Sequence, residues 1–133
     1  MTTLHSFDGT DGQEPYAGLV QGTVGTFYGT TVYGGARTCA SPGCGTVFTL
    51  SVGLGPFVKT NPAAGKVGAT IGILGTDLTG ATGVNFNGTA TAFRVVSSSF
   101  IDAKVPSGAT TGTVQVQLPG GPLSSNVSFI VLH

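Results

Sequence analysis

The chain has 133 residues, a length that favours one domain or one domain with a small additional unit. Only 8% of the residues are charged, the formal net charge is zero, and the five basic residues are scattered. This charge pattern excludes the basic patch of a nucleic-acid-binding protein and the polybasic cluster that binds membrane surfaces. No apolar run is long enough to span a membrane.

The residue pattern predicts an all-β protein. No stretch keeps an apolar period of about 3.6 residues for roughly ten residues, which argues against helices, whereas apolar and polar residues alternate repeatedly. The 23 glycines and 7 prolines fit many short strands joined by tight turns.

Residues 1–50 form a first part that is rich in glycine and aromatic residues. Its candidate strands are residues 4–7, 18–21, 26–31 and 46–51. Four short strands with periodic glycine and aromatic residues indicate a small β-meander similar to one propeller blade. Residues 51–55 form the expected linker to a second part, residues 56–133.

Three acidic residues, Asp8, Asp11 and Glu14, lie within seven positions of the first part. Two carboxylates across a groove can hydrolyse a glycosidic bond, so these acids are the candidate catalytic residues if the protein is an enzyme. Asp8 and Asp11 could also bind calcium together with backbone carbonyls, although the full calcium-loop pattern is missing. The favoured interpretation is a solvated turn in which the aspartates bond to their own backbone.

A serine-histidine-aspartate triad would require His5, with Asp8 or Asp11 as its orienting acid. The chain has no Gly-x-Ser-x-Gly elbow, so an ordinary polar role at a strand edge is favoured for His5.

Aromatic residues of the first part offer two interpretations. Tyr16, Tyr28 and Tyr33 could form a stacking platform that binds sugars. Alternatively, they form the core of the small unit, and this second interpretation is favoured.

The two cysteines, Cys39 and Cys44, flank a Pro-Gly turn. A local disulfide is the favoured interpretation, and two free thiols are the alternative. A zinc site is the weakest option because a second pair of ligands is missing nearby.

The second part shows the alternation typical of a β-sandwich. Residues 56–61 predict an edge strand, because proline cannot donate to a central ladder. Residues 67–74 place Ile71 and Ile73 on one face, and Asn87-Gly88 marks a hairpin. The alternation then continues along the chain in Val84 and Phe86, Phe93 and Val95, Ile101, Ala103 and Val105, Val114, Val116 and Leu118, and Val127, Phe129 and Val131. About seven strands at this spacing predict an immunoglobulin-like sandwich.

Several motifs of the second part occur in a known family. They are Asn61-Pro62-Ala63-Ala64-Gly65, Gly75-Thr76-Asp77-Leu78, Val84-Asn85-Phe86-Asn87-Gly88, Ile101-Asp102-Ala103-Lys104-Val105-Pro106 and Ser128-Phe129-Ile130-Val131. On these residues the segment from about 57 to 132 resembles the IPT/TIG domain, an immunoglobulin-like module. Gly72 departs from the usual alternation and leaves the face of its strand undecided. The resemblance implies a spacer or adhesion role.

The first part resembles a tandem repeat of bacterial extracellular proteins. The matching segments are Leu4-His5-Ser6-Phe7-Asp8-Gly9, Pro15-Tyr16-Ala17-Gly18-Leu19-Val20-Gln21-Gly22 and Phe27-Tyr28-Gly29-Thr30-Thr31. A repeat unit that cannot bury its apolar face alone needs a neighbour, so we expect a homo-oligomer, most simply a dimer, formed through residues 1–50.

The sequence therefore predicts a non-catalytic structural, adhesion or spacer module, belonging to a longer repeat protein that is secreted or exposed on the bacterial cell surface. The expected localisation depends on the resemblances and the uncharged composition, because Met1 is followed by polar residues without signal-peptide regions. The alternative is a small carbohydrate-binding module or hydrolase, a glycosidase rather than an esterase. No cofactor other than calcium is implied.

Overall fold

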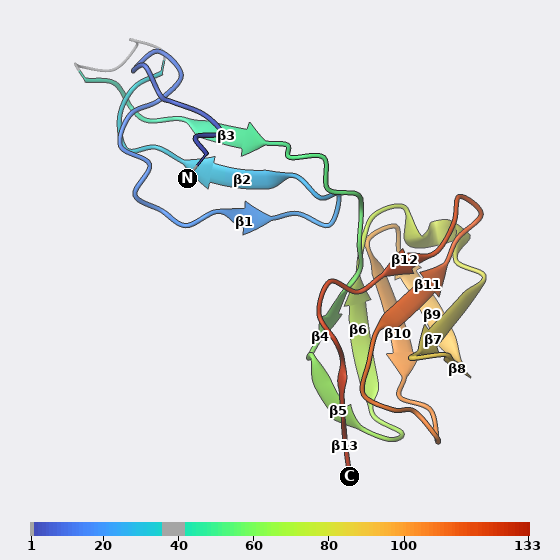
Figure 1. Ribbon diagram of the computed structural model, residues 1–133. Helices are drawn as coiled ribbons and strands as arrows, with labels where there is room; N and C mark the ends of the chain where they lie inside the picture. The colour runs from blue at the N-terminus through green and yellow to red at the C-terminus, as the bar shows by residue number, and fades with distance from the viewer. Residues whose placement is uncertain (1, 36–41) are drawn as a thin grey trace. The chain divides into compact units, whose positions relative to one another are not determined.

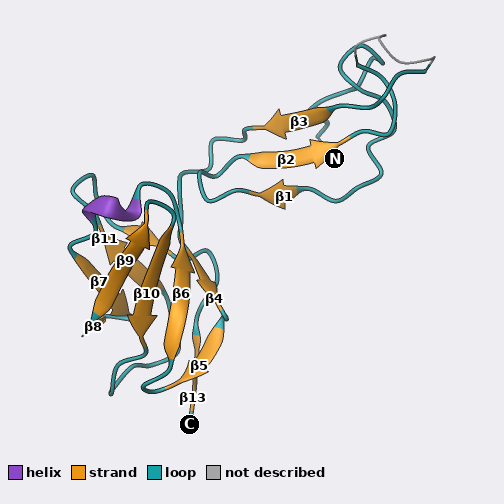
Figure 2. Ribbon diagram, turned by 180° about the vertical axis from the view of Figure 1, so that it is seen from behind, coloured by secondary structure: helices purple, strands orange, loops and turns teal. Residues whose placement is uncertain are grey.

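A computed structural model describes residues 2–35 and 42–133, and it confirms the all-β fold class (Figure 1). The chain separates into two compact units: an N-terminal unit that ends at Leu54 and a C-terminal unit, Gly55–His133. In the described residues, both units consist of strands and loops, apart from one short 3-10 turn, η1 (Leu78–Gly80), in the C-terminal unit (Figure 2). Within the described residues, no helix has the length and apolar character that a membrane span requires.

The N-terminal unit contains one antiparallel sheet in the order β1-β2-β3. Its strands are β1 (Val20–Gln21), β2 (Phe27–Thr30) and β3 (Val47–Leu50). These strands lie within three of the four predicted segments, but the predicted strand at residues 4–7 is wrong. A strand needs a ladder partner for its backbone. This segment is instead held by its side chains, since the Phe7 ring packs edge-on against Phe48 with centroids 5.0 Å apart.

Threonine hydroxyls and closely packed glycine backbone occupy the interior of the N-terminal unit. The buried Thr31 hydroxyl lies 2.9 Å from the Thr46 hydroxyl, which donates to the Asp11 carbonyl over 2.9 Å. Gly34 and Gly43 pair in a bridge, and a Cβ atom on Gly34 would lie 2.7 Å from the carbonyl oxygen of Gly9. No large apolar side chain among the described residues of this unit is buried.

The C-terminal unit, all of whose residues are described, is a sandwich of two four-stranded sheets with a small parallel pair at its side (Figure 2). One sheet has the order β4-β6-β10-β9, the other β12-β11-β7-β8, and β13 pairs with β5. The strands are β4 (Lys59–Asn61), β5 (Ala64–Lys66), β6 (Thr70–Leu74), β7 (Gly83–Phe86), β8 (Thr89–Thr91), β9 (Phe93–Ser97), β10 (Phe100–Lys104), β11 (Val114–Gln117), β12 (Leu123–Ser124) and β13 (Ile130–Leu132).

Alternation along the central strands builds the core of this sandwich. In one sheet Ile101 of β10 lies opposite Ile73 of β6, and both are buried. In the other sheet Val116 of β11 lies opposite Val84 of β7, again with both buried. The predicted inward faces of these central strands are confirmed, and burial of apolar area on both sheets is the main stabilising contribution.

The boundaries of several predicted strands differ from the structure. Residues 67–69 precede β6, because Gly68 adopts a left-handed turn with φ 85° between β5 and β6. Val127 is exposed, and the last strand begins only at Ile130. The predicted Asn87-Gly88 hairpin is confirmed between β7 and β8, with φ values of 47° and 90° at the two turn residues.

Gly72 faces outward, which settles the orientation of β6. The inward side chains of this strand are Ile71 and Ile73, and the Phe100 ring covers the open face of Gly72. A Cβ atom on Gly72 would lie 2.6 Å from that ring, so the glycine makes room for the aromatic side chain.

Candidate functional site

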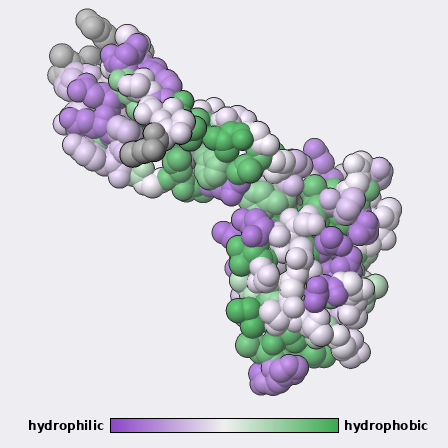
Figure 3. All heavy atoms as spheres, in the orientation of Figure 1, coloured by the Kyte–Doolittle hydropathy of each residue, from purple (hydrophilic) through white to green (hydrophobic). Residues whose placement is uncertain are grey.

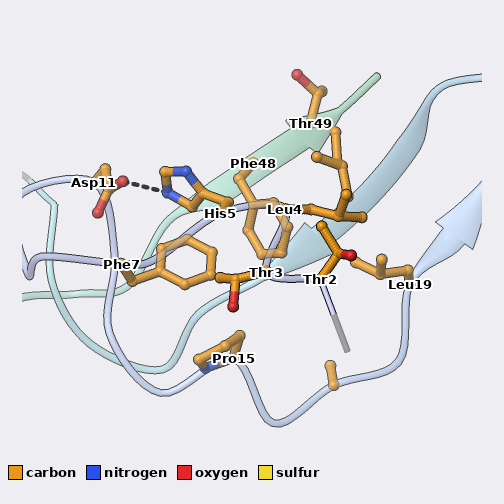
Figure 4. Close-up of a pocket in the computed structure, with 12 residues that line it drawn as sticks. Thr2, Thr3, Leu4, His5, Phe7, Asp11, Pro15, Leu19, Phe48 and Thr49 are labelled. Atoms are coloured by element: carbon orange, nitrogen blue, oxygen red, sulfur yellow. Dashed lines mark hydrogen bonds and ion pairs between the residues drawn. The ribbon is translucent and has the colours of Figure 1, made fainter. Parts of the chain in front are cut away.

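A hollow of about 670 Å³ in the N-terminal unit is the candidate site (Figure 4). More than half of its lining residues are apolar. The lining consists of Thr2, Thr3, Leu4, His5, Phe7, Asp11, Pro15, Ala17, Leu19, Phe48, Thr49 and Leu50. A mostly apolar hollow with a few polar groups is the usual form of a binding site.

The β1-β2-β3 sheet positions the apolar wall of the hollow. Phe48 and Leu50 alternate with exposed Val47 and Thr49 along β3, so the two apolar side chains share one face. Gly29 of β2 lies opposite Phe48, and a Cβ atom there would lie 2.5 Å from the Phe48 ring. The Phe48 side chain can therefore lie flat over the sheet only because position 29 is glycine.

A histidine-aspartate pair forms the polar end of the hollow. His5 Nε2 lies 2.6 Å from Asp11 Oδ2 (Figure 4). The Asp8 backbone N–H donates to Asp11 Oδ1 over 3.0 Å. The His5 ring packs edge-on against Phe7 with centroids 4.8 Å apart. The structure thus brings together His5 and one of the two acids that the sequence offered as its orienting partner.

Asp8 forms a local turn outside the lining of the hollow. Its Oδ1 accepts hydrogen bonds from the Thr10 hydroxyl and from the Thr10 N–H at 2.9 Å. These bonds, led by the hydroxyl, hold the pKa of this exposed carboxyl below its ordinary value of 3.8. A glycosidase acid has to keep its proton near neutral pH, so a lowered pKa does not suit Asp8 to that role.

Glu14 is also outside the lining, so Asp11 is the one member of the three candidate acids that faces the hollow. Glu14 has a left-handed backbone with φ 60°, and its carbonyl accepts the Val32 N–H over 3.2 Å. Within residues 2–35 and 42–133, no group of three or more histidine, cysteine, aspartate or glutamate side chains could hold a metal ion.

The three candidate tyrosines lie on the surface. Tyr16, Tyr28 and Tyr33 are 79%, 42% and 36% exposed, so the favoured interpretation that they form a core is wrong. The physical reason is that the described residues of the N-terminal unit form a single sheet, and no second layer among those residues covers the tyrosines. The predicted disulfide falls outside the described residues, because Cys39 does so.

Sequence reasoning singled out His5 and Asp11 but missed the apolar residues that build the hollow. Phe7 and Leu19 stood only within segments that resemble the repeat, and Phe48 only within a candidate strand. The alternation of Phe48 and Leu50 around Thr49 was the one sequence pattern that could have predicted the apolar wall of the hollow.

Comparison with known proteins identifies the sandwich. The family described as IPT/TIG domain matches residues 57–131, the segment that holds both four-stranded sheets, and no curated protein matches the chain. The IPT/TIG domain is a non-catalytic immunoglobulin-like module, in agreement with the apolar interior of the C-terminal unit. The chain therefore belongs to the IPT/TIG domain family.

Proposed function

We propose that this chain is a structural module of a secreted or cell-surface bacterial protein, in which the sandwich acts as a spacer or adhesion unit. The observation that carries the proposal is the filled core of the C-terminal unit. Its buried positions are almost all apolar, and no buried side-chain nitrogen or oxygen in the described residues lacks a hydrogen-bond partner. A filled apolar core of this kind suits a module that holds its shape and presents its surface to neighbours.

For the N-terminal unit, we propose the role of one repeat in a repeat protein. Many of its apolar side chains remain exposed, and apolar residues gather over its sheet on the face that Figure 3 shows. Units of this kind gain stability when a neighbour covers their apolar surface. The proposed role of the N-terminal unit is therefore to pack on another copy, which makes the protein a homo-oligomer.

One observation favours a second candidate function. The hollow combines apolar walls with the His5–Asp11 pair, so a small carbohydrate-binding module or a glycosidase is the alternative. In that function Asp11 is the acid placed to contact a ligand.

A panel of chromogenic glycosides and esters tests the two functions, with calcium present and with calcium absent. The structural role predicts no turnover by the native chain. Turnover of a glycoside that is lost in Asp11→Asn and kept in Glu14→Gln, whose side chain lies outside the hollow, would contradict it and favour a glycosidase that works in the hollow.

A further inference from the structure

We propose that Asn87 is a chemical modification site, which loses its side-chain amide by spontaneous deamidation, and that native contacts hold this reaction back. The Asn87-Gly88 pair forms the tight turn between β7 and β8, with φ values of 47° and 90°. Both residues are exposed, so water reaches the turn. This inference goes beyond the proposed structural role and does not depend on it, because the site lies wholly in the C-terminal unit.

The reaction joins two groups that are neighbours in the chain, so ring closure is intramolecular. The Gly88 backbone nitrogen loses its proton and attacks Cγ of Asn87. The new N–Cγ bond closes a five-membered succinimide ring while the Cγ–Nδ2 bond breaks, and the side-chain nitrogen takes up a proton and leaves as ammonia. Water is the only co-reactant: it opens the ring at either carbonyl and leaves aspartate or isoaspartate.

Asn87 is the asparagine of this chain that suits the reaction best. The other three asparagines are followed by Pro62, Phe86 and Val127. Proline has no backbone N–H that could become the nucleophile, and the phenylalanine and valine side chains crowd the attacking nitrogen. Gly88 has no side chain, and glycine adopts backbone conformations that other residues avoid.

Contacts with a neighbouring loop hold the Asn87 amide. Its Nδ2 donates to the Thr110 hydroxyl over 2.8 Å and to the Thr111 carbonyl over 3.3 Å. The amide group lies directly over Gly112, where a Cβ atom would overlap with it. Attack on Cγ makes this carbon tetrahedral and moves Nδ2 out of the amide plane. The reaction therefore disturbs both hydrogen bonds and needs space that the loop occupies.

The attacking nitrogen is restrained as well. The Gly88 N–H donates to Oδ1 of Asn85 over 3.1 Å. A hydrogen bond to the protonated form of a group stabilises that form, so this bond opposes loss of the N–H proton. Asn85 is itself positioned in the sheet, since its Nδ2 donates to Gln115 Oε1 over 3.4 Å. Native contacts thus restrain both reacting groups, and local opening of the β7-β8 hairpin releases both.

The product changes the contacts that restrained the reaction. A carboxylate at position 87 has no N–H to donate, so it faces the Thr111 carbonyl with an oxygen instead. Isoaspartate also adds a methylene group to the main chain, which a two-residue turn cannot accept without a shift in the register of β7 and β8. Each opening of the hairpin therefore exposes the chain to a permanent loosening of this turn.

Mass spectrometry of peptides from the full chain, incubated at mildly alkaline pH, measures the reaction at each asparagine. Deamidation replaces NH₂ by OH and changes the peptide mass, whereas isomerisation at Asp8 or Asp11, which also precede glycines, does not. The chain unfolded in guanidinium chloride should deamidate at Asn87 at least about tenfold faster than the native chain, because the restraining hydrogen bonds are lost. The other three asparagines are internal controls and should react much more slowly.

Two substitutions of Thr110 test the local restraint. Thr110→Val removes the hydroxyl that accepts from Asn87 and should raise the rate in the native chain at least about threefold. Thr110→Ser is the matched control, because it keeps a hydroxyl, and its rate should stay within about twofold of that of the native chain. Thr110 is exposed, so both variants keep the fold, and urea denaturation measures the stability of each.

Three outcomes would overturn the inference. The first is an equal rate at Asn87 in the native and the unfolded chain, and the second is an unfolded chain in which Asn87 reacts no faster than the other asparagines. The third is a rate for Thr110→Val that does not rise, or that rises only in proportion to the fraction of unfolded chain. That result would mean that the reaction follows global unfolding and that the contacts of Asn87 do not restrain it.

Discussion

Replacing Phe129 with alanine lowers the expected free energy of unfolding of the C-terminal unit by about 3–5 kcal/mol. The Phe129 ring is 1% exposed and packs edge-to-face on Phe86 with centroids 5.1 Å apart. Truncation removes the transfer free energy of the ring and leaves a cavity between the sheets, which the surrounding strands fill only in part.

Urea denaturation followed by far-ultraviolet circular dichroism measures the Phe129→Ala effect. Ile130→Ala is the matched control, because Ile130 is the next residue in the chain and is exposed; its expected cost is under about 1 kcal/mol. Equal costs at the two positions would mean that Phe129 is not a core residue.

Replacing Ile101 with aspartate is expected to unfold the C-terminal unit. Ile101 is 0% exposed and lies between Ile73 and Val95 in the middle of its sheet. A carboxylate there would lie in the apolar core beside Ile73 and Val95, and burying an unpaired charge costs several kcal/mol. That cost is comparable to the total stability of a small domain, about 5–15 kcal/mol.

The ¹H–¹⁵N correlation spectrum of the full chain gives the readout for Ile101→Asp. Val96→Asp introduces the same side chain on the neighbouring strand β9, where Val96 is 50% exposed, and it should keep the dispersed signals of a folded sandwich. We expect Ile101→Asp to collapse the signals of the C-terminal unit. A dispersed spectrum for this variant would contradict the inward orientation of β10.

The central strands of the C-terminal unit were predictable because each has one buried face. A period of two places Ile71 and Ile73 on the same side regardless of how the strands connect. The short strand β5 (Ala64–Lys66) shows no such alternation, and its parallel pairing with β13 joins distant parts of the chain. Local sequence carries no signal for that pairing, so β5 was missed.

In the candidate site, too, the features made by local contacts could be predicted from the sequence, and those made by distant contacts could not. The turn around Asp8 was predictable, because the side chain bonds to Thr10 only two residues away. The hollow depends on Phe7 meeting Phe48 across 41 positions (48 − 7), which no local pattern specifies. The tyrosines were misplaced for a related reason: aromatic content indicates a core only where a second layer exists to cover it.

Native-state hydrogen exchange of the full chain, followed by NMR at a low micromolar concentration, tests the central claim. The claim is that, among the described residues, only the C-terminal unit has a buried apolar core. Backbone amides of the central strands β6, β10 and β11 should exchange only through global unfolding of that unit, whereas amides of β2 should exchange through smaller openings and much faster. Equal protection of β2 and β10 in the monomer would contradict the account, because it would require a buried core in the N-terminal unit as well.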